Sequence, residues 1–420
     1  MTAEKPRLAF VSPVFLFPRN TGGRIRTSNI LRGLKGGSFD ITLLSPATAH
    51  LREQWGADLE LLCDRFVQWD AGRPKSRWAR AADLLDELPI NVVADRRRQG
   101  IDQVSATLAS NAFSVVVFDF VHAAVLRPER VNAATVCFTH NVEAEIFQRH
   151  AQRARNPVMR RIWSSQHAKM ARFEGDALRR FDAVIAVSER DADGFRSRYG
   201  LATASTIPTG VDLDYFSWQE PALPSATAAP TVVFIGSMDW DANVDGVQHF
   251  LSEVWPRVLE KVPQAQFTVV GRNPPHSLIR QAASVRGVTL TGLVEDVRPY
   301  VRAAQVSVIP LRVGGGTRIK AFEAMAMGCP VVSTSIGVEG LDVVPDVHYL
   351  NKDDAAAQAQ GIVELLSDTG LRSRLSRQAR VLVEGKFGHA VAARAFERIC
   401  LSALEARRGS GVMRRSDAPC

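Results

Sequence analysis

The sequence predicts an α/β protein with two domains, each built on a mostly parallel sheet. Its 420 residues exceed what one hydrophobic core commonly supports. Short apolar runs alternate with helix-like stretches through both halves, which is the pattern of parallel α/β sheets. Between the halves, residues 219–230 are rich in Pro, Ala, Ser and Thr, a composition typical of linkers.

We expect the first domain over residues 1–218. The segment from residue 48 to residue 98 gives no clear pattern, but apolar runs elsewhere are bounded by turns or helix-like stretches. A helix is expected over Thr27–Leu34, and another runs to about Tyr199. The expected strands are Arg7–Val11, Asp40–Ser45, Ser114–Asp119, Ala134–Phe138 and Asp182–Ser188.

We expect the second domain over residues 231–387, with residues 388–407 completing the first domain and a loose tail over residues 408–420. Each expected strand of the second domain ends in glycine or a small polar residue, which marks the ligand edge of a parallel sheet. The expected strands are Thr231–Ile235, Gln266–Val270, Val288–Leu290, Gln305–Leu311 and Val331–Thr334. The expected helices are Val244–Trp255, Ile319–Met327, Asp353–Leu366, Leu371–Glu384 and Ala390–Arg407.

The composition is that of an ordinary globular protein, with 46% hydrophobic and 23% charged residues and a net charge of +8. No apolar run reaches the roughly 18 residues that span a bilayer. The apolar stretch Leu8–Phe17 is interrupted by Pro13 and lacks a following cleavage site, so we interpret it as a buried strand rather than a signal peptide. The five cysteines have no metal-ligand spacing, which favours reduced thiols in the cytoplasm.

The segment Arg149 to Arg180 is strongly basic, with apolar Met159, Trp163, Met170 and Phe173 between its charges. Such a segment can lie on an anionic membrane surface, and the alternatives are a solvated helix face or a nucleic-acid site. No helix-turn-helix, zinc or RNA-binding motif accompanies it, so no nucleic-acid partner is expected. The protein would then be cytoplasmic, and peripheral at the inner face of the cell membrane.

The stretch Gly314 to Gly328 (GGGTRIKAFEAMAMG) joins a strand-like run to a helix start. Glycines let the backbone approach a ligand, and the first free amides of a helix attract anions. Arg318 and Lys320 add positive charge where the helix dipole itself would favour acids. The pattern indicates a diphosphate site, with Glu323 one turn further on to hold sugar hydroxyls. The alternative is a buried helix entered by a flexible loop.

Polar residues follow the strands of the first domain as well. Gly22 and Gly23 come after the first strand, but their spacing is not the GxGxxG of nicotinamide or flavin sites. His122 follows one buried strand, and His140 and Asn141 follow the next. A neutral imidazole at such a position can accept a proton or bind a sugar hydroxyl, or can have a structural role only.

These motifs resemble those of the GT-B glycosyltransferases, in the retaining family-four (glycosyl transferases group 1) type. The resemblance extends to about residue 400 and is strongest at Gly22-Gly23, at Ile207–Phe216 (IPTGVDLDYF) and at Gly314 to Ser335. It implies two Rossmann-like domains that face a central cleft, with the C-terminal helix crossing back to the first domain. It also implies a nucleotide-diphosphate sugar held mainly by the second domain, and a glycan or lipid-linked acceptor held mainly by the first.

The resemblance assigns roles to individual residues. His140, Arg318 and Lys320 are the expected catalytic residues, and His122, His140 and Asn141 are expected on the acceptor side. The residues expected at the donor are Gly22, Gly23, Gly236, Ser237, Gly271, Arg272, Gly292, Val294, Gly314, Gly315, Gly316, Thr317, Arg318 and Glu323.

The sequence departs from the family pattern at two places. Gly315 stands where members usually carry the first of two motif glutamates, and Glu323 matches the second. The loop after the second domain's first strand, residues 236–240, contains no Arg or Lys, so Arg318 and Lys320 are the expected replacements. We expect an altered donor site rather than a lost one.

The expected reaction moves a sugar from a nucleotide-diphosphate sugar to a lipid-linked or polysaccharide intermediate of surface glycan synthesis, with retention of configuration. Fixed cations would stabilise the departing diphosphate, so no metal and no cofactor are expected. Asp239 and Asp241 form no convincing metal-binding pair. The alternatives are a nucleotide-sugar epimerase of the same fold and a non-catalytic binding protein with a vestigial site.

Overall fold

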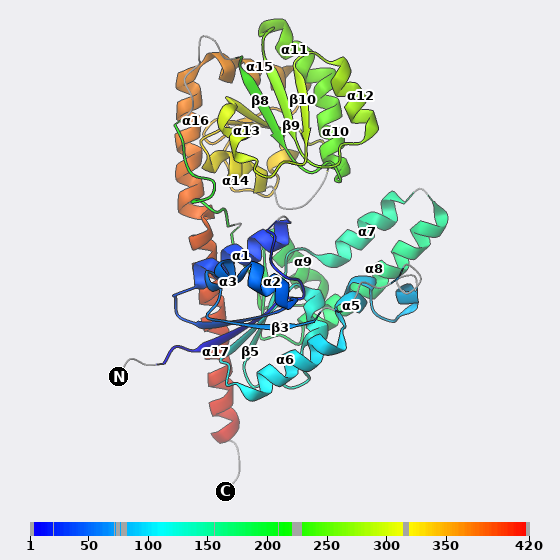
Figure 1. Cartoon of the computed structure of the whole chain (residues 1–420), viewed down its shortest axis with the longest axis vertical. Coiled ribbons are helices and arrows are strands. Elements are labelled where there is room, and N and C mark those ends of the chain that lie inside the picture. The colour runs from blue at the N-terminus through cyan, green and yellow to red at the C-terminus, as the bar shows by residue number, and fades with distance from the viewer. Residues whose placement is uncertain are drawn as a thin grey trace. The chain divides into compact units, whose positions relative to one another are not determined.

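The computed structural model describes residues 4–19, 21–70, 72, 76, 82–154, 156–208, 210–220, 229–313 and 319–416. The chain divides into two compact units (Figure 1): Met1–Gly210 with His389–Cys420, and Val211–Gly388. This division differs from the boundary expected at residues 219–230. Residues after Gly210 pack with the second unit, because Phe216 is buried in its core and the backbone N–H of Gln219 donates to the carbonyl of Met327 at 3.4 Å.

The first unit contains a parallel sheet. In the part of the chain that the structure describes, its seven strands have the order β3-β2-β1-β4-β5-β6-β7. Their bounds are β1 Arg7–Val11, β2 Asp40–Pro46, β3 Arg65–Trp69, β4 Val115–Asp119, β5 Ala134–Phe138, β6 Ala183–Ala186 and β7 Ala204–Thr206. The sequence did not predict β3, because this edge strand (RFVQW) is only partly buried and lacks the apolar run of its neighbours.

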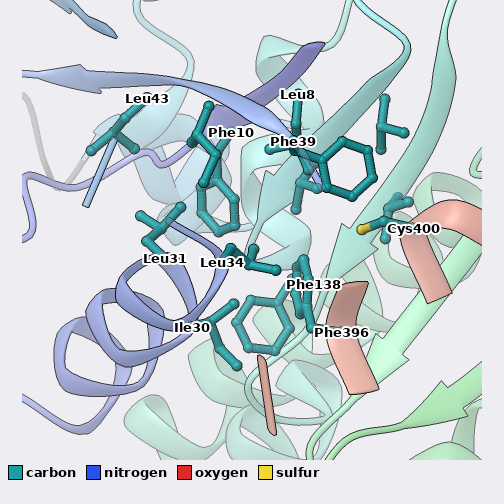
Figure 2. Close-up of a cluster of buried hydrophobic side chains, with 14 of the residues drawn as sticks. Leu8, Phe10, Ile30, Leu31, Leu34, Phe39, Leu43, Phe138, Phe396 and Cys400 are labelled. Carbon is teal, nitrogen blue, oxygen red and sulfur yellow. The ribbon is translucent and has the colours of Figure 1, made fainter. Parts of the chain in front are cut away.

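Two helices distant in the sequence cover one face of this sheet. They are α1 (Gly22–Leu34) and α17 (His389–Ser416), and their apolar side chains form one core with β1, β2 and β5 (Figure 2). The ring of Phe396 on α17 is fully buried, with its centroid 5.1 Å from that of Phe138 and 6.3 Å from that of Phe10. The C-terminal helix therefore belongs to the first unit, as expected.

Helix α17 continues to Ser416, although the composition from Arg408 onward predicted a loose tail. Extending a formed helix costs much less than starting one, so a Gly- and Ser-containing stretch can continue an existing helix.

The remaining helices of the first unit include two that form a hairpin. Helices α7 and α8 pack against each other and extend away from the sheet (Figure 1). The basic segment occupies most of this hairpin. The bounds are α2 Ala49–Gln54, α3 Gly56–Glu60, α5 Ile90–Asp95, α6 Arg98–Ser110, α7 Glu143–Arg153, α8 Pro157–Leu178 and α9 Glu189–Tyr199.

The second unit also has a parallel sheet. Over the residues with described positions, its six strands have the order β10-β9-β8-β11-β12-β13. Their bounds are β8 Thr231–Ile235, β9 Gln266–Val270, β10 Val288–Gly292, β11 Val306–Ile309, β12 Val331–Ser333 and β13 Leu350–Asn351. Its helices are α10 Asp241–His249, α11 Trp255–Lys261, α12 His276–Ser284, α13 Arg298–Ala303, α14 Ile319–Ala326, α15 Ala355–Ser367 and α16 Thr369–Leu382.

The helices on both sides of this sheet bury two apolar clusters, one around Trp255 and one around Phe322. Among the helices of the described residues, none has the length and apolar character needed to cross a membrane.

Candidate functional site

A buried histidine–aspartate pair lies at the carboxyl edge of the first unit's sheet. Asp119 ends β4, and His140 follows the neighbouring strand β5. The Nε2 of His140 lies 2.7 Å from Oδ1 of Asp119, and the side chains are 2% and 0% exposed. Parallel α/β sheets bind ligands at this edge, so the pair occupies a position where a site is expected.

Three further residues form hydrogen bonds with this histidine–aspartate pair. The hydroxyls of Thr27 and Ser12 donate to the Asp119 carboxylate at 3.0 Å each. On the other side of the ring, Nη1 of Arg26 lies 3.3 Å from Nδ1 of His140. When Nε2–H donates to Asp119, Nδ1 is left to accept from Arg26, so both ring nitrogens are engaged. Burial lowers the pKa of His140, against the opposing charge of Asp119, so the ring is neutral at neutral pH.

Phe120 joins His140 to the glycine pair. Its ring stacks on His140 with centroids 3.9 Å apart and on His122 at 5.0 Å, and its backbone φ is 68°, which is unusual outside glycine. A Cβ added to Gly23 would lie 2.6 Å from Cζ of Phe120, so only glycine allows this contact. Helix α1 begins at Gly22, and the two glycines form its first turn rather than a loop before it.

His122 belongs to a second pair on the same edge. Its Nδ1 bonds to the carboxylate of Asp95 at the end of α5. Burial alone would lower the pKa of His122, but the hydrogen bond and charge of Asp95 outweigh it and raise the pKa. Asn141 follows His140, and its Nδ2 donates to Oε1 of Glu143 at 3.4 Å. The three expected acceptor-side residues therefore lie on adjacent strand ends.

An acid on α8 supports the start of α7. Glu174 is fully buried and accepts from the backbone N–H groups of Glu143 at 2.8 Å and Ala144 at 3.4 Å, and from the hydroxyl of Tyr199 at 2.8 Å. Burial raises its pKa to about 7, although these hydrogen bonds favour the charged form. Glu174 thus joins the hairpin to the edge that holds His140.

In the second unit, Lys320 lies against the end of β8. Its Nζ donates to Oδ1 of Asn243 at 2.8 Å and lies 4.6 Å from the centroid of the Phe234 ring. Asn243 in turn donates from Nδ2 to the carbonyl of Ser237 at 2.7 Å. A Cβ on Gly236 would come within 2.9 Å of the Lys320 ammonium, so this cation lies directly over the first loop of the unit.

The first two strand ends of this unit meet through glycines. A Cβ on Gly271 would lie 1.9 Å from the carbonyl oxygen of Gly236. The two strand ends can therefore approach this closely only because residue 271 has no side chain. Next to them, Nε of Arg272 lies 3.3 Å from Oγ of Ser237 and 2.8 Å from a carboxylate oxygen of Asp239. Asp239 is part of this local network, and Arg272 supplies a cation to a loop that has none in its own sequence.

Glu323 follows Lys320 by three residues on α14, so both side chains lie on one side of the helix. Burial raises the pKa of Glu323 to about 7, against the charge of Lys320. Gly292 ends β10 with a φ of 71°, and Val294 packs against the apolar cluster around Phe322. The expected residues Gly314, Gly315, Gly316, Thr317 and Arg318 lie outside the described residues.

The structure thus brings together Gly236, Ser237, Gly271, Arg272 and Lys320 within the second unit, and Gly23, His122, His140 and Asn141 within the first. Sequence reasoning missed Asn243, Asp95 and Glu174, for which the sequence offers no local signal. It placed Asp119 at a strand end without giving it a role. The helical period could have indicated Arg26 and Thr27, which follow the glycine pair by one turn.

The described residues contain no group of three or more His, Cys, Asp or Glu side chains arranged to hold a metal ion. The expectation that the reaction needs no metal stays a prediction.

Two family models match the chain. Residues 229–368 match "Glycosyl transferases group 1", and residues 21–215 match "Glycosyltransferase Family 4". The matches fall one in each half of the chain and contain the strand ends described above. The protein is therefore a glycosyltransferase of the GT-B fold and belongs to this group, which the sequence motifs indicated. This assignment favours transfer over the epimerase and the non-catalytic alternatives.

Two relatives and one solved structure illustrate what the chain is similar to. An "uncharacterized 44.6 kDa protein in cps region" of Klebsiella pneumoniae is 21% identical over 80% of this chain and 84% of its own. The phosphatidyl-myo-inositol mannosyltransferase of Mycobacterium leprae is 31% identical over 41% of this chain and 46% of its own. The solved structure of HepE from Anabaena, in complex with UDP and glucose, has a TM-score of 0.64 at 13% identity, with 94% of this chain and all of that chain (100%) covered.

Proposed function

We propose that this glycosyltransferase takes its sugar from a nucleotide-diphosphate donor and transfers it, with retention, to a lipid-linked or polysaccharide intermediate of surface glycan synthesis. The observation that carries the donor part is the Lys320 ammonium, which Asn243 holds over the Gly236 loop at the carboxyl edge of β8. The complex of HepE with UDP, in the same fold, is consistent with this choice.

The positions of Lys320 and Arg272 suit a diphosphate that gains charge as the glycosidic bond breaks. Cations that are already held in place stabilise such a developing charge without reorganisation, so they lower the barrier in place of a metal ion. From its place in the sequence motif we assign the same role to Arg318, and we assign Glu323 to the ribose hydroxyls. The pKa of Glu323, raised to about 7, then falls when a donor hydroxyl hydrogen-bonds to its charged form.

Thermal shift against UDP, GDP, ADP, TDP and CMP tests the donor site, because a ligand that binds only the folded state raises its melting temperature. We expect one nucleoside diphosphate to stabilise the wild type, Lys320→Ala and Glu323→Ala to weaken its binding at least tenfold, and CMP to do little. Lys261→Ala, at the exposed end of α11, is the control. If Lys320→Ala binds as the wild type does, the donor assignment is wrong.

On the acceptor side we place His140, His122 and Asn141. His140 is neutral but has both ring nitrogens engaged with Asp119 and Arg26, so an acceptor hydroxyl would have to replace one of these contacts. His122 uses Nδ1 for its hydrogen bond to Asp95, and no hydrogen bond of its Nε2 is seen among the described residues, so Nε2 is the ring nitrogen that an acceptor hydroxyl could contact. His122→Ala should therefore raise the KM for the acceptor with little change in the KM for the donor.

The tip of the α7–α8 hairpin is our proposed membrane contact. Val158 and Met159 are 67% and 41% exposed, and Arg160 and Arg161 beside them are also exposed. Apolar side chains next to arginines are typical of surfaces that lie on anionic lipid. The name of the mannosyltransferase relative includes a phospholipid, which supports a lipid-linked acceptor in the membrane. The enzyme would then be peripheral at the inner face of the membrane.

Vesicle flotation tests this contact. The wild type should float with vesicles containing phosphatidylglycerol and stay behind with neutral vesicles. A variant with Arg160→Glu and Arg161→Glu should lose flotation, whereas Arg394→Glu with Arg398→Glu on exposed positions of α17 should keep it. Equal flotation of both variants would exclude the hairpin tip as the membrane contact.

Two further measurements test the reaction itself. Retention of configuration is read from the anomeric coupling of the product, and metal independence from activity in excess EDTA.

A further inference from the structure

A cavity of about 670 Å³ lies at the carboxyl edge of the first unit's sheet, beyond β2 and β3. Residues 47–49 follow β2 and Asp70 follows β3 in its wall, and the first half of α6 closes it. Because β2 pairs with β1, and β1 pairs with β4, this cavity opens on the same edge as the strand ends of His122 and His140. It shares no lining residue with them, so it is a separate hollow of that edge.

The lining of the cavity is polar without being basic. It contains the carboxamides of Gln68, Gln99 and Gln103 and the carboxylates of Asp70 and Asp102. None of the described residues that line it is Lys, Arg or His. Carboxamides offer both donors and acceptors and carboxylates offer acceptors, which is the set that pairs with hydroxyl groups. The two carboxylates of the lining disfavour a phosphate, and the nearest printed cation, Arg98, lies outside the lining and contacts Asp102.

Helix α6 presents one polar row to this cavity. Asp102 and Gln103 each lie three or four residues from both Gln99 and Ala106, so the four residues lie on one side of the helix. Ala106 is exposed and small, which keeps the cavity open at that end. The alanines and Trp69 of the lining add apolar surface, which suits the C–H face of a sugar ring.

Part of the hydrogen-bonding capacity of the lining is not used within the described residues. Oε1 of Gln68 on β3 has no partner there, although it is covered and reaches a ligand only if the side chain turns. Nε2 of Gln103 donates to Oγ1 of Thr107 at 3.3 Å, which leaves its carbonyl oxygen for a ligand. Asp102 contacts Arg98 at 3.6 Å, with side chains 68% and 94% exposed, and a surface pair of this kind holds little energy. Asp70 accepts from the backbone N–H of Gly72 with one oxygen, at 2.7 Å. Polar groups that stay unpaired in a hollow are available to a ligand.

We propose that this cavity binds an uncharged sugar residue of the acceptor glycan, other than the residue that receives the new sugar. This inference rests on the proposed transfer to a glycan acceptor and adds a subsite to it. Binding at a second subsite would make an oligosaccharide a better acceptor than a single sugar. Selection arises because polar groups built to meet hydroxyls are left unpaired when a ligand lacks them.

The test uses the full chain and neutral tetrasaccharides of glucose, galactose and mannose, followed by saturation-transfer NMR and calorimetry. Ala106→Trp fills the cavity from an exposed helix position, and Ala109→Trp adds the same bulk to an exposed position of α6 outside this lining. We expect at least one tetrasaccharide to bind the wild type and Ala109→Trp equally. Ala106→Trp, and the pair Gln99→Ala with Gln103→Ala, should weaken it at least tenfold.

Inorganic phosphate and glycerol 3-phosphate form the anionic arm, and neither should displace the tetrasaccharide. The subsite is refuted if no tetrasaccharide binds the wild type, if binding persists in Ala106→Trp, or if phosphate competes. UDP and GDP thermal shifts are recorded on the same samples and should be equal in all variants. If the wild type shows no thermal shift with UDP or GDP but still binds the tetrasaccharide, and Ala106→Trp abolishes that binding, only the donor proposal is refuted. The two failures are therefore distinguishable.

Discussion

The Nε2 of His140 donates to Oδ1 of Asp119 across 2.7 Å, and this contact joins the ends of β4 and β5 in a nearly solvent-free interior. The same carboxylate accepts from Thr27 on α1 and from Ser12 after β1, so this one acid on β4 accepts from donors on three other elements. The buried carboxylate of Asp119 therefore holds these elements together, in addition to orienting His140 on the side of the protein where we place the acceptor sugar.

Asp119→Ala should therefore destabilise the first unit strongly. The change leaves the Thr27 hydroxyl and one imidazole N–H buried without their acceptor, and each such group costs roughly 1–3 kcal/mol, whereas the Ser12 hydroxyl keeps the carbonyl of Val14 at 3.0 Å. We expect a loss of about 3 kcal/mol or more in the free energy of unfolding, measured by urea denaturation. Asp193→Ala, with an aspartate side chain 71% exposed on α9, is the control and should change little. Equal effects of the two changes would contradict this role.

The pH dependence of stability should contain a contribution from Glu174. Burial raises its pKa from 4.5 to about 7, so between these values the folded chain keeps a proton that the unfolded chain has lost. The free energy of unfolding then falls as pH rises through this window, by up to about 3 kcal/mol from this group. Above pH 7 the folded carboxylate is charged too, and the loss is complete.

Glu174→Gln should remove that part of the pH dependence, since the amide keeps an acceptor for the α7 backbone but does not titrate. The measurement is the melting temperature from pH 5 to pH 8, followed by circular dichroism. Glu60→Gln on the exposed end of α3 should leave the wild-type curve unchanged. An unaltered slope in Glu174→Gln would show that Glu174 is already ionised at pH 5.

Gly271→Ala should disrupt the donor unit without touching any charge. The added methyl would lie 1.9 Å from the carbonyl oxygen of Gly236, and because that atom is backbone, the two strand ends must separate. Overpacking of this kind costs about 1–3 kcal/mol. We expect nucleotide binding, read by thermal shift, to weaken at least tenfold. Gly385→Ala in the same unit, where a Cβ meets nothing within 4 Å, should bind nucleotide normally.

Phe396→Ala should loosen the C-terminal helix from the first unit. The ring is fully buried between Phe10 and Phe138, and deleting such a side chain costs about 3–5 kcal/mol. Hydrogen exchange should rise along α17 and α1 together, while Arg398→Ala on the exposed side of α17 should change neither. Increased exchange confined to α17 would mean that the two helices do not share one core.

The central strands and their glycine-marked ends followed directly from the sequence, because buried parallel strands are continuous apolar runs. The edge strands β3, β7 and β13 did not: half-buried residues of β3 such as Gln68 carry no such signal, and β7 and β13 are only three and two residues long. Glu323 and Lys320 could be placed one turn apart from helical spacing alone. The partner of Lys320, Asn243, could not be placed in this way, because 77 residues separate the two and only the fold brings α10 to α14.

The exchange of the chain between the two units has a practical consequence. A Cβ added at Gly210, where the chain leaves the first unit, would lie 3.2 Å from Cα of His389, where the chain returns, and Val211 pairs with Gly388 just beyond. The chain thus leaves the first unit and returns to it at neighbouring positions. Residues 211–388 could be excised and the ends rejoined by a few residues, to give an isolated half on which acceptor sugars are assayed without any nucleotide background.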